Sequence, residues 1–156
     1  MKKINFLINL KEEGKLKIVE PSEDIKESYI NKSNNSLKSA DILLENDQVE
    51  NAVPMAYYSM YNMLTALFFK VGIKCENHSA SIIILKELFG LDNSEISFAK
   101  TERVDKQYYV DFDINKKEVE NMLKSTEEFN SKLYDFIEKL TTKQAADYKK
   151  EFEESL

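Results

Sequence analysis

Residues that break or turn a polypeptide chain are scarce in this sequence, which has 3 glycines and 2 prolines among its 156 residues. β-Sandwiches and β-barrels need turn residues at their many strand connections, so this scarcity argues against an all-β fold. Long apolar runs are also missing: no 18 consecutive residues are apolar, so we expect no membrane-spanning helix. The first apolar stretch is short and has no small-residue cleavage site after it, which argues against a signal peptide. The sequence therefore predicts a cytoplasmic protein.

Cysteine, histidine and arginine occur once each, as Cys75, His78 and Arg103. One cysteine and one histidine cannot form an intrachain disulfide or a four-ligand zinc site. The net charge is −6, without the excess of lysine and arginine that a generic duplex-coating protein uses. Neither glycine-rich phosphate motif, GxGxxG or GxxxxGK followed by Ser or Thr, is present. We therefore predict no metal, no cofactor and no generic binding to duplex DNA.

Apolar residues spaced three or four apart are the main positive signal, and this spacing is typical of amphipathic helices. Ser22 followed by two acidic residues indicates the start of one long helix, and Asn115 with Glu118 resembles a capping box at the start of another. Residues 15–19 alternate only briefly before Pro21, so we interpret them as an extended connector rather than part of a sheet. The predicted helices cover residues 3–13, 23–45, 51–71, 78–89, 94–109 and 116–140, with a last helix beginning at 141 or 142.

The helix predicted at 51–71 is apolar on most of its faces, which is typical of a helix surrounded by other helices. Pro54 is tolerated only near the first turn, so we expect the helix to begin at about Asn51, and Gly72 ends it. One stripe at helical spacing comprises Ala52, Val53, Ala56, Tyr57, Met60, Met63, Leu64, Leu67, Phe68 and Val71. A second stripe comprises Met55, Tyr58, Asn62, Thr65 and Phe69. We therefore place this helix at the centre of the fold.

Short connections between consecutive amphipathic helices favour antiparallel neighbours. The sequence thus predicts an all-α fold, an up-and-down antiparallel bundle of four to five main helices with short N-terminal and C-terminal helices. We expect a single domain over residues 1–156, with a leader segment at 1–21, a core bundle at 22–140 and a C-terminal helix at 141–156. The charged tail at 149–154 is expected to be solvated and to fray.

Two pairs of side chains have a spacing that would allow chemistry. Cys75 and His78 could form a thiolate–imidazole pair, but packing of Cys75 and a polar role for His78 at a helix start are the favoured interpretation. Asp111 and Asp113 could hold a divalent ion, but such ions generally need more oxygen ligands. Capping and solubility explain this second pair better.

Tyr58, Asn62 and Thr65 lie at positions i, i+4 and i+7 of the central helix and form a row of polar-tipped side chains. Such a row could line a groove where nucleotide bases stack or a partner helix docks, or it could simply be packed in the interior. For Tyr58 and Asn62 the sequence supports both interpretations equally. Tyr57 and Leu64 follow the core stripe, so we assign them to packing.

The segment at 37–89, LKSADILLENDQVENAVPMAYYSMYNMLTALFFKVGIKCENHSASIIILKELF, resembles the HEPN family (higher eukaryotes and prokaryotes nucleotide-binding domain). The shared features are a leucine-rich helix end, an AYYSMF-like helix, an apolar run ending in glycine, a His-Ser step and a helix ending in Leu-Phe. The upstream EEGKLKIVEPS resembles the family's leader, and ERVDKQYYVDF, with Arg103 and Tyr108, resembles its Arg-to-Tyr segment. The acidic helix through 127–129 is similar too, so the resemblance covers about residues 4–140.

This resemblance implies an all-α bundle, often dimeric. It also implies, for many members, an RNase whose Arg and His are spaced R-x(4–6)-H across a dimer, commonly with a minimal nucleotidyltransferase partner in a toxin–antitoxin pair. The positions that match the Arg and His are Met55 and Asn62. A thioether has no charge to stabilise the transition state, and a neutral carboxamide cannot exchange a proton near pH 7. We therefore expect the usual RNase chemistry to be absent.

The resulting hypothesis is a HEPN-like binding module that forms a homodimer and acts as a nucleotidyltransferase partner or as a nucleotide or RNA binder. Its predicted groove comprises Tyr58, Asn62, Thr65, His78, Arg103 and Tyr108. Two alternatives stay open. One is an active RNase toxin with a rearranged site at His78 and Arg103, and the other is a purely structural interaction protein.

Overall fold

The computed structural model describes residues 3–108 and 114–156, and the pair Asp111 and Asp113 lies outside these ranges. The described elements, in chain order, are α1 (Ile4–Glu12), β1 (Leu16–Ile18), α2 (Glu23–Glu45), α3 (Val49–Val71), β2 (Ile73–Cys75), α4 (His78–Glu87), α5 (Ser94–Tyr108), α6 (Lys116–Lys139) and α7 (Thr142–Ser155). The predicted all-α fold is confirmed. In the described ranges, none of the helices combines the length and the apolar character needed to cross a bilayer.

Three of the long helices begin at side-chain caps that satisfy otherwise unpaired backbone N–H groups. Ser22 Oγ accepts from the backbone N–H of Ile25 at 3.2 Å at the start of α2. Asn115 Oδ1 accepts from Glu118 N–H at 2.9 Å before α6. Thr141 forms a reciprocal capping box at the start of α7. The caps predicted at Ser22 and Asn115 are thereby confirmed.

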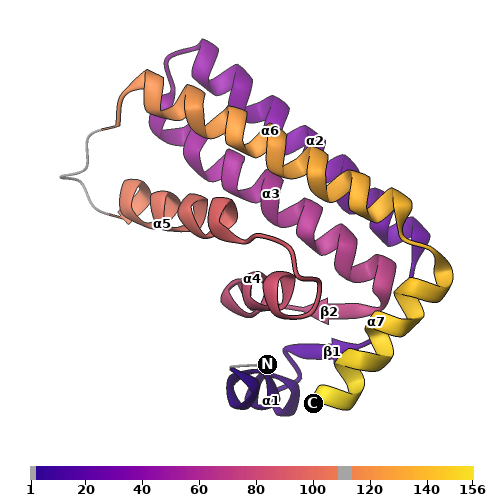
Figure 1. The fold of residues 1–156 in the computed structure, drawn as a ribbon. Coiled ribbons are helices and arrows are strands. Elements are labelled where there is room, and N and C mark those ends of the chain that lie inside the picture. Colours follow the sequence, from indigo (N-terminus) through magenta and orange to yellow (C-terminus); the bar gives the residue numbers. More distant parts are fainter. Residues whose placement is uncertain (1–2, 109–113) are drawn as a thin grey trace.

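Helix α3 lies at the centre of the molecule, packed against α2 and α6 on one side and against α4 and α5 on the other (Figure 1). The consecutive helices α2 and α3 run antiparallel, as do α5 and α6. Tyr57, Met60 and Leu64 are fully buried, as the first stripe predicts. The helix begins two residues earlier than predicted, so Pro54 lies in its second turn, where the missing N–H removes one intrahelical hydrogen bond.

A short polar network joins α2, α3 and α6 inside the apolar core. Ser59 Oγ donates to the Ser33 carbonyl at 2.8 Å, and Ser33 Oγ donates back to the Ser59 carbonyl at 2.7 Å. From α6, Asn130 Nδ2 donates to Ser59 Oγ at 2.8 Å. All three residues are buried, so these bonds satisfy polar groups that would otherwise destabilise the interior. The network fixes the register of α2 and α6 against the central helix.

The segment interpreted as an extended connector is instead a strand, so that prediction is wrong. β1 pairs antiparallel with β2, with Leu16 opposite Cys75 and Ile18 opposite Ile73. Strands of three residues are too short to show a recognisable alternation of apolar and polar residues in the sequence. Leu16 and Ile73 are both buried, and their burial holds the strand pair against the helical bundle. This ribbon joins the leader segment to the end of α3.

The charged C-terminal tail is helical through Ser155, so the fraying expected there is not observed. Phe152 is fully buried, although its neighbours in sequence are charged and mostly exposed. On the same helix, the Tyr148 ring lies 5.0 Å from the ring of Phe89. Burial of Phe152 and Ala145 fixes α7 on the core, because burying apolar side chains opposes the entropy lost when the helix is ordered.

Candidate functional site

Helices α3, α4 and α5 bring a group of aromatic and basic side chains together. Asn77 caps α4: its Oδ1 accepts from Ala80 N–H at 2.9 Å and thereby fixes the first turn, which contains His78 and Ser79. The tyrosines come from the AYYSMY segment of α3, and the cations come from α5. We name the group the tyrosine–arginine cluster; it comprises Tyr57, Tyr58, Tyr61, His78, Lys100 and Arg103.

His78 lies between two tyrosines of α3. A hydrogen bond of 2.7 Å joins the Tyr57 hydroxyl and His78 Nδ1. The imidazole also stacks on Tyr61, with ring centroids 3.8 Å apart and planes 22° apart. Tyr57 is fully buried while Tyr61 is partly exposed, so the hydrogen-bond partner of the imidazole belongs to the core and its stacking partner is partly accessible to solvent.

Arg103 contacts Tyr57 and its neighbour Tyr58. Its Nη1 donates to the Tyr58 hydroxyl at 3.1 Å, and its Cζ lies 5.0 Å from the Tyr57 ring centroid, within the range of a cation–π contact. The buried Nε–H of Arg103 has no acceptor among the described residues. One turn earlier on α5, Lys100 Nζ donates to Ser79 Oγ, so a second cation lies beside His78.

These contacts leave the cluster positively charged. Burial lowers the pKa of His78, and the charges of Arg103 and Lys100 lower it further. Burial also raises the pKa of the Tyr57 hydroxyl, against a smaller opposing effect of Arg103. The imidazole and the phenol are therefore neutral near pH 7, and the charge comes from the guanidinium and the ammonium groups. Such a cluster stabilises an anion.

A pocket of about 300 Å³ lies beside the cluster and shares Tyr61 and His78 with it. Thr65 and Cys75 also line this pocket. The Cys75 Sγ donates to the Asn77 carbonyl at 3.3 Å, and burial raises the pKa of its thiol. A thiolate–imidazole pair is therefore disfavoured, since the thiol stays protonated and His78 Nδ1 is bonded to Tyr57 instead.

Three of the six predicted groove residues belong to the cluster: Tyr58, His78 and Arg103. Thr65 lines the adjoining pocket, and Asn62 is half-buried on the same face of α3, between Tyr58 and Thr65. The side chain of the sixth, Tyr108, is outside the part of the chain that the structure describes.

Sequence reasoning missed Tyr57, Tyr61 and Lys100 as members of the site. Tyr57 is a core residue, as predicted, but its hydroxyl is also the partner of His78. The spacing of Tyr57 and Tyr61, four residues apart, places them one above the other on the helix and was the available signal. Lys100 had a comparable signal, because it precedes Arg103 by three residues on α5.

The positions that match the R-x(4–6)-H pair are both on α3 and both half-buried. Met55 packs against the hydrophobic core. Asn62 lies seven residues further on, two turns along the helix. Neither supplies a charge or a titratable proton near pH 7, so the chemistry of that pair is absent from these two positions.

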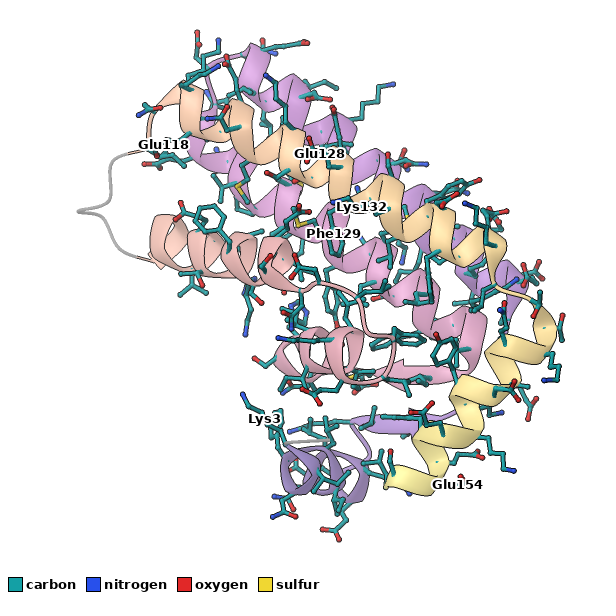
Figure 2. The ribbon with its side chains drawn as sticks, viewed as in Figure 1. Lys3, Glu118, Glu128, Phe129, Lys132 and Glu154 are labelled. Carbon is teal, nitrogen blue, oxygen red and sulfur yellow. The ribbon has the colours of Figure 1, made fainter. Side chains whose placement is uncertain are left out.

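The chain is therefore an all-α helical bundle, and the tyrosine row of its central helix meets a histidine from α4 and an arginine from α5. The HEPN domain matches residues 26–140, and the chain belongs to the HEPN family. The matched range includes the acidic segment of α6, where Phe129 is buried and Glu128 is exposed (Figure 2). None of the curated proteins compared with the chain matches it.

Proposed function

We propose that this HEPN domain is a binding module for nucleotides or RNA and lacks RNase catalysis of the R-x(4–6)-H type. The observation that carries the proposal is the tyrosine–arginine cluster, in which a guanidinium and an ammonium lie beside three tyrosine rings and an imidazole. Cationic groups pair with phosphate oxygens, and aromatic faces stack on bases. The two kinds of group together suit a nucleotide better than an inorganic anion or an apolar ligand.

The charge of the whole protein strengthens this argument. The net charge is −6, yet both cations at the cluster are close enough to His78 to lower its pKa. Two cations of an acidic protein therefore lie beside the aromatic faces. The guanidinium has five donor hydrogens and the bond to the Tyr58 hydroxyl uses one of them, which supports further contact of the group with an oxygen supplied by a ligand.

Calorimetric titration with ATP, with ADP and with a short single-stranded RNA tests the proposal. We expect saturable binding, and we expect Arg103→Gln to weaken it about tenfold or more, because a charge-assisted hydrogen bond is lost. Lys143→Gln is the matched control: it removes one positive charge from an exposed site on α7 and should leave binding unchanged. No heat and no rise in melting temperature with any of the three ligands would refute the proposal in favour of a structural interaction protein.

One observation favours a second candidate, an RNase with a rearranged site. His78 is neutral near pH 7, as a general base must be, and Tyr57 connects it to Arg103, which could stabilise a charged transition state. We expect purified protein to leave mixed RNA intact, because His78 Nδ1 and Arg103 Nη1 are both engaged by tyrosine hydroxyls. Cleavage that disappears in both His78→Ala and Arg103→Ala would establish the RNase instead.

We further propose that the module acts as a homodimer or beside a nucleotidyltransferase, as the family resemblance implies. The most exposed large apolar side chain among the described residues, Phe98 of α5 at 60% exposure, supports an interaction surface on that helix. Light scattering should give twice the mass of one chain, or one chain plus its partner when the two are co-purified. A strictly monomeric mass in both preparations would contradict this part of the proposal.

A further inference from the structure

The pocket beside the tyrosine–arginine cluster has the size and the walls of a site for a planar ring. Its volume of about 300 Å³ is at the lower end of the range for ligand pockets, enough for a base but small for a whole nucleotide. Two pairs of stacked rings contribute to its lining. Tyr29 and Phe69 are 5.6 Å apart with planes at 7°, and Tyr61 stacks on His78. These four residues all line the pocket, which we name the Thr65 pocket.

Thr65 gives the pocket a polar group in a fixed orientation. Its Oγ1 donates to the Tyr61 carbonyl at 2.9 Å, so the hydroxyl hydrogen is used within the helix. The oxygen keeps its acceptor lone pairs, which can receive an N–H of a base. The Cys75 hydrogen is likewise directed at a carbonyl, that of Asn77. The lining also includes Lys74 and Glu76, which form an ion pair of 3.2 Å with each other. The pocket therefore offers aromatic faces and an acceptor, and the cations of the cluster, Lys100 and Arg103, lie outside its lining.

The pocket and the cations are arranged along one face of α3. Tyr58, which Arg103 contacts, and Thr65 are seven residues apart on this face, or about 10 Å along the helix axis. His78 belongs to both the pocket and the cluster. It lines the pocket, and its Nδ1 is hydrogen-bonded to Tyr57, whose ring contacts the Arg103 guanidinium. A nucleoside carrying two phosphates extends over a distance of this order, as do a base and a neighbouring phosphate of an RNA chain.

We infer that the Thr65 pocket takes the base of a nucleotide whose phosphates contact Arg103 and Lys100; the inference rests on the proposed function and adds the place and orientation of the ligand. The base lies among Tyr29, Tyr61 and Thr65, and the phosphates lie over the cations of α5. The same arrangement accepts a free nucleotide or a nucleotide unit of single-stranded RNA, because both present a base joined to a phosphate.

Three probes separate the two halves of the site: ADP, adenosine as the base without phosphate, and pyrophosphate as the phosphate without base. Thr65→Phe fills the pocket, and we expect it to weaken ADP about tenfold and to remove adenosine binding while pyrophosphate still binds. Arg103→Gln should do the reverse, removing pyrophosphate and sparing adenosine. Binding of adenosine and pyrophosphate is followed by ligand-observed NMR, because fragments bind weakly.

Two further variants control for folding. Thr65→Ser keeps the hydroxyl and should keep ADP affinity, whereas Thr142→Phe places the same bulky residue at an exposed position of α7 and should have no effect. Circular dichroism and melting temperature verify that each variant is folded. A tetranucleotide of adenosine then identifies the source: tighter binding than ADP, with the same sensitivity to both site variants, indicates RNA, and weaker binding indicates the free nucleotide.

The inference is overturned if ADP binds the wild type and loses affinity in Arg103→Gln, but is unaffected by Thr65→Phe. In that case the base lies elsewhere, and the proposed function survives without this pocket. If neither ADP nor the tetranucleotide binds the wild-type protein, the proposed function itself fails. The two failures are therefore distinguishable in one set of titrations.

Discussion

His78 occupies a position that disfavours its protonated form on three counts. It is partly buried, it lies near two cations, and it is the first residue of α4, where the helix dipole is positive. The pKa of His78 in the folded protein is therefore below its ordinary value of 6.5. In the unfolded chain the same imidazole binds a proton more readily, which links its ionisation to folding.

This linkage predicts how stability depends on pH. Between the folded-state pKa and 6.5 the unfolded chain binds more protons, so the free energy of unfolding must fall as the pH drops through this window. We expect His78→Asn to lose this contribution. Urea denaturation at about pH 7.5 and about pH 5.5 measures the difference, and the decrease on acidification should be smaller in the variant than in the wild type. An equal decrease in both proteins would show that His78 is not the group responsible.

At the scale of the element, the cap of α4 is what orders the cluster's histidine. Without the bond from Ala80 N–H to Asn77 Oδ1, the first turn of α4 loses the group that sets the direction of His78 and Ser79. We expect Asn77→Ala to lower the free energy of unfolding by about 1 kcal/mol and to weaken nucleotide binding as well. Urea denaturation measures the first effect, and calorimetric titration measures the second.

Helix α6 supplies the matched comparison, because Asn115 caps it in the same way and its side chain bonds to Glu118, which is not a member of the cluster. Asn115→Ala should cost about the same in stability, about 1 kcal/mol, and leave nucleotide affinity unchanged. If both variants weaken binding equally, the effect of Asn77→Ala is a general loss of stability and not a loss of order at the site.

The elements also show what a sequence can predict and what it cannot. The caps at Ser22 and Asn115 were predictable because donor and acceptor are three residues apart, so the signal is local. The β1–β2 ribbon was not, because its strands have three residues each and are far apart in the chain. No periodicity can be recognised in three residues, and their pairing depends on the packing of the whole bundle.

In the candidate site, too, features set by one helix were predictable and contacts between helices were not. The tyrosine row was predictable from helical spacing, because α3 alone determines which of its residues share a face. The meeting of Arg103 with His78 was not, since these residues are on different helices and come together only through Tyr57. Contacts of this kind depend on how α4 and α5 pack against the central helix, which residue spacing does not encode.

At the scale of the whole molecule, the HEPN match covers residues 26–140, but residues before and after this range also pack in the hydrophobic core. Leu7 of the leader and Phe152 of α7 are both fully buried. They belong to the same hydrophobic core as the central helix. We therefore propose that residues from α1 to α7 unfold as one cooperative unit, in which the segments outside the family match contribute to the stability of those inside it.

Phe152→Ala tests whether α7 unfolds together with the rest of the molecule, because it removes a buried ring from this C-terminal helix. If α7 belongs to the same cooperative unit, the variant should lower the global free energy of unfolding by about 3–5 kcal/mol, with far-UV circular dichroism and tyrosine fluorescence still giving coincident transitions. Tyr134→Ala is the control, because this aromatic residue is 45% exposed and its loss should change stability far less. The opposite result would be a main unfolding transition at the wild-type urea concentration together with a separate transition at lower urea concentration. In that case α7 unfolds independently, and the cooperative unit does not include it.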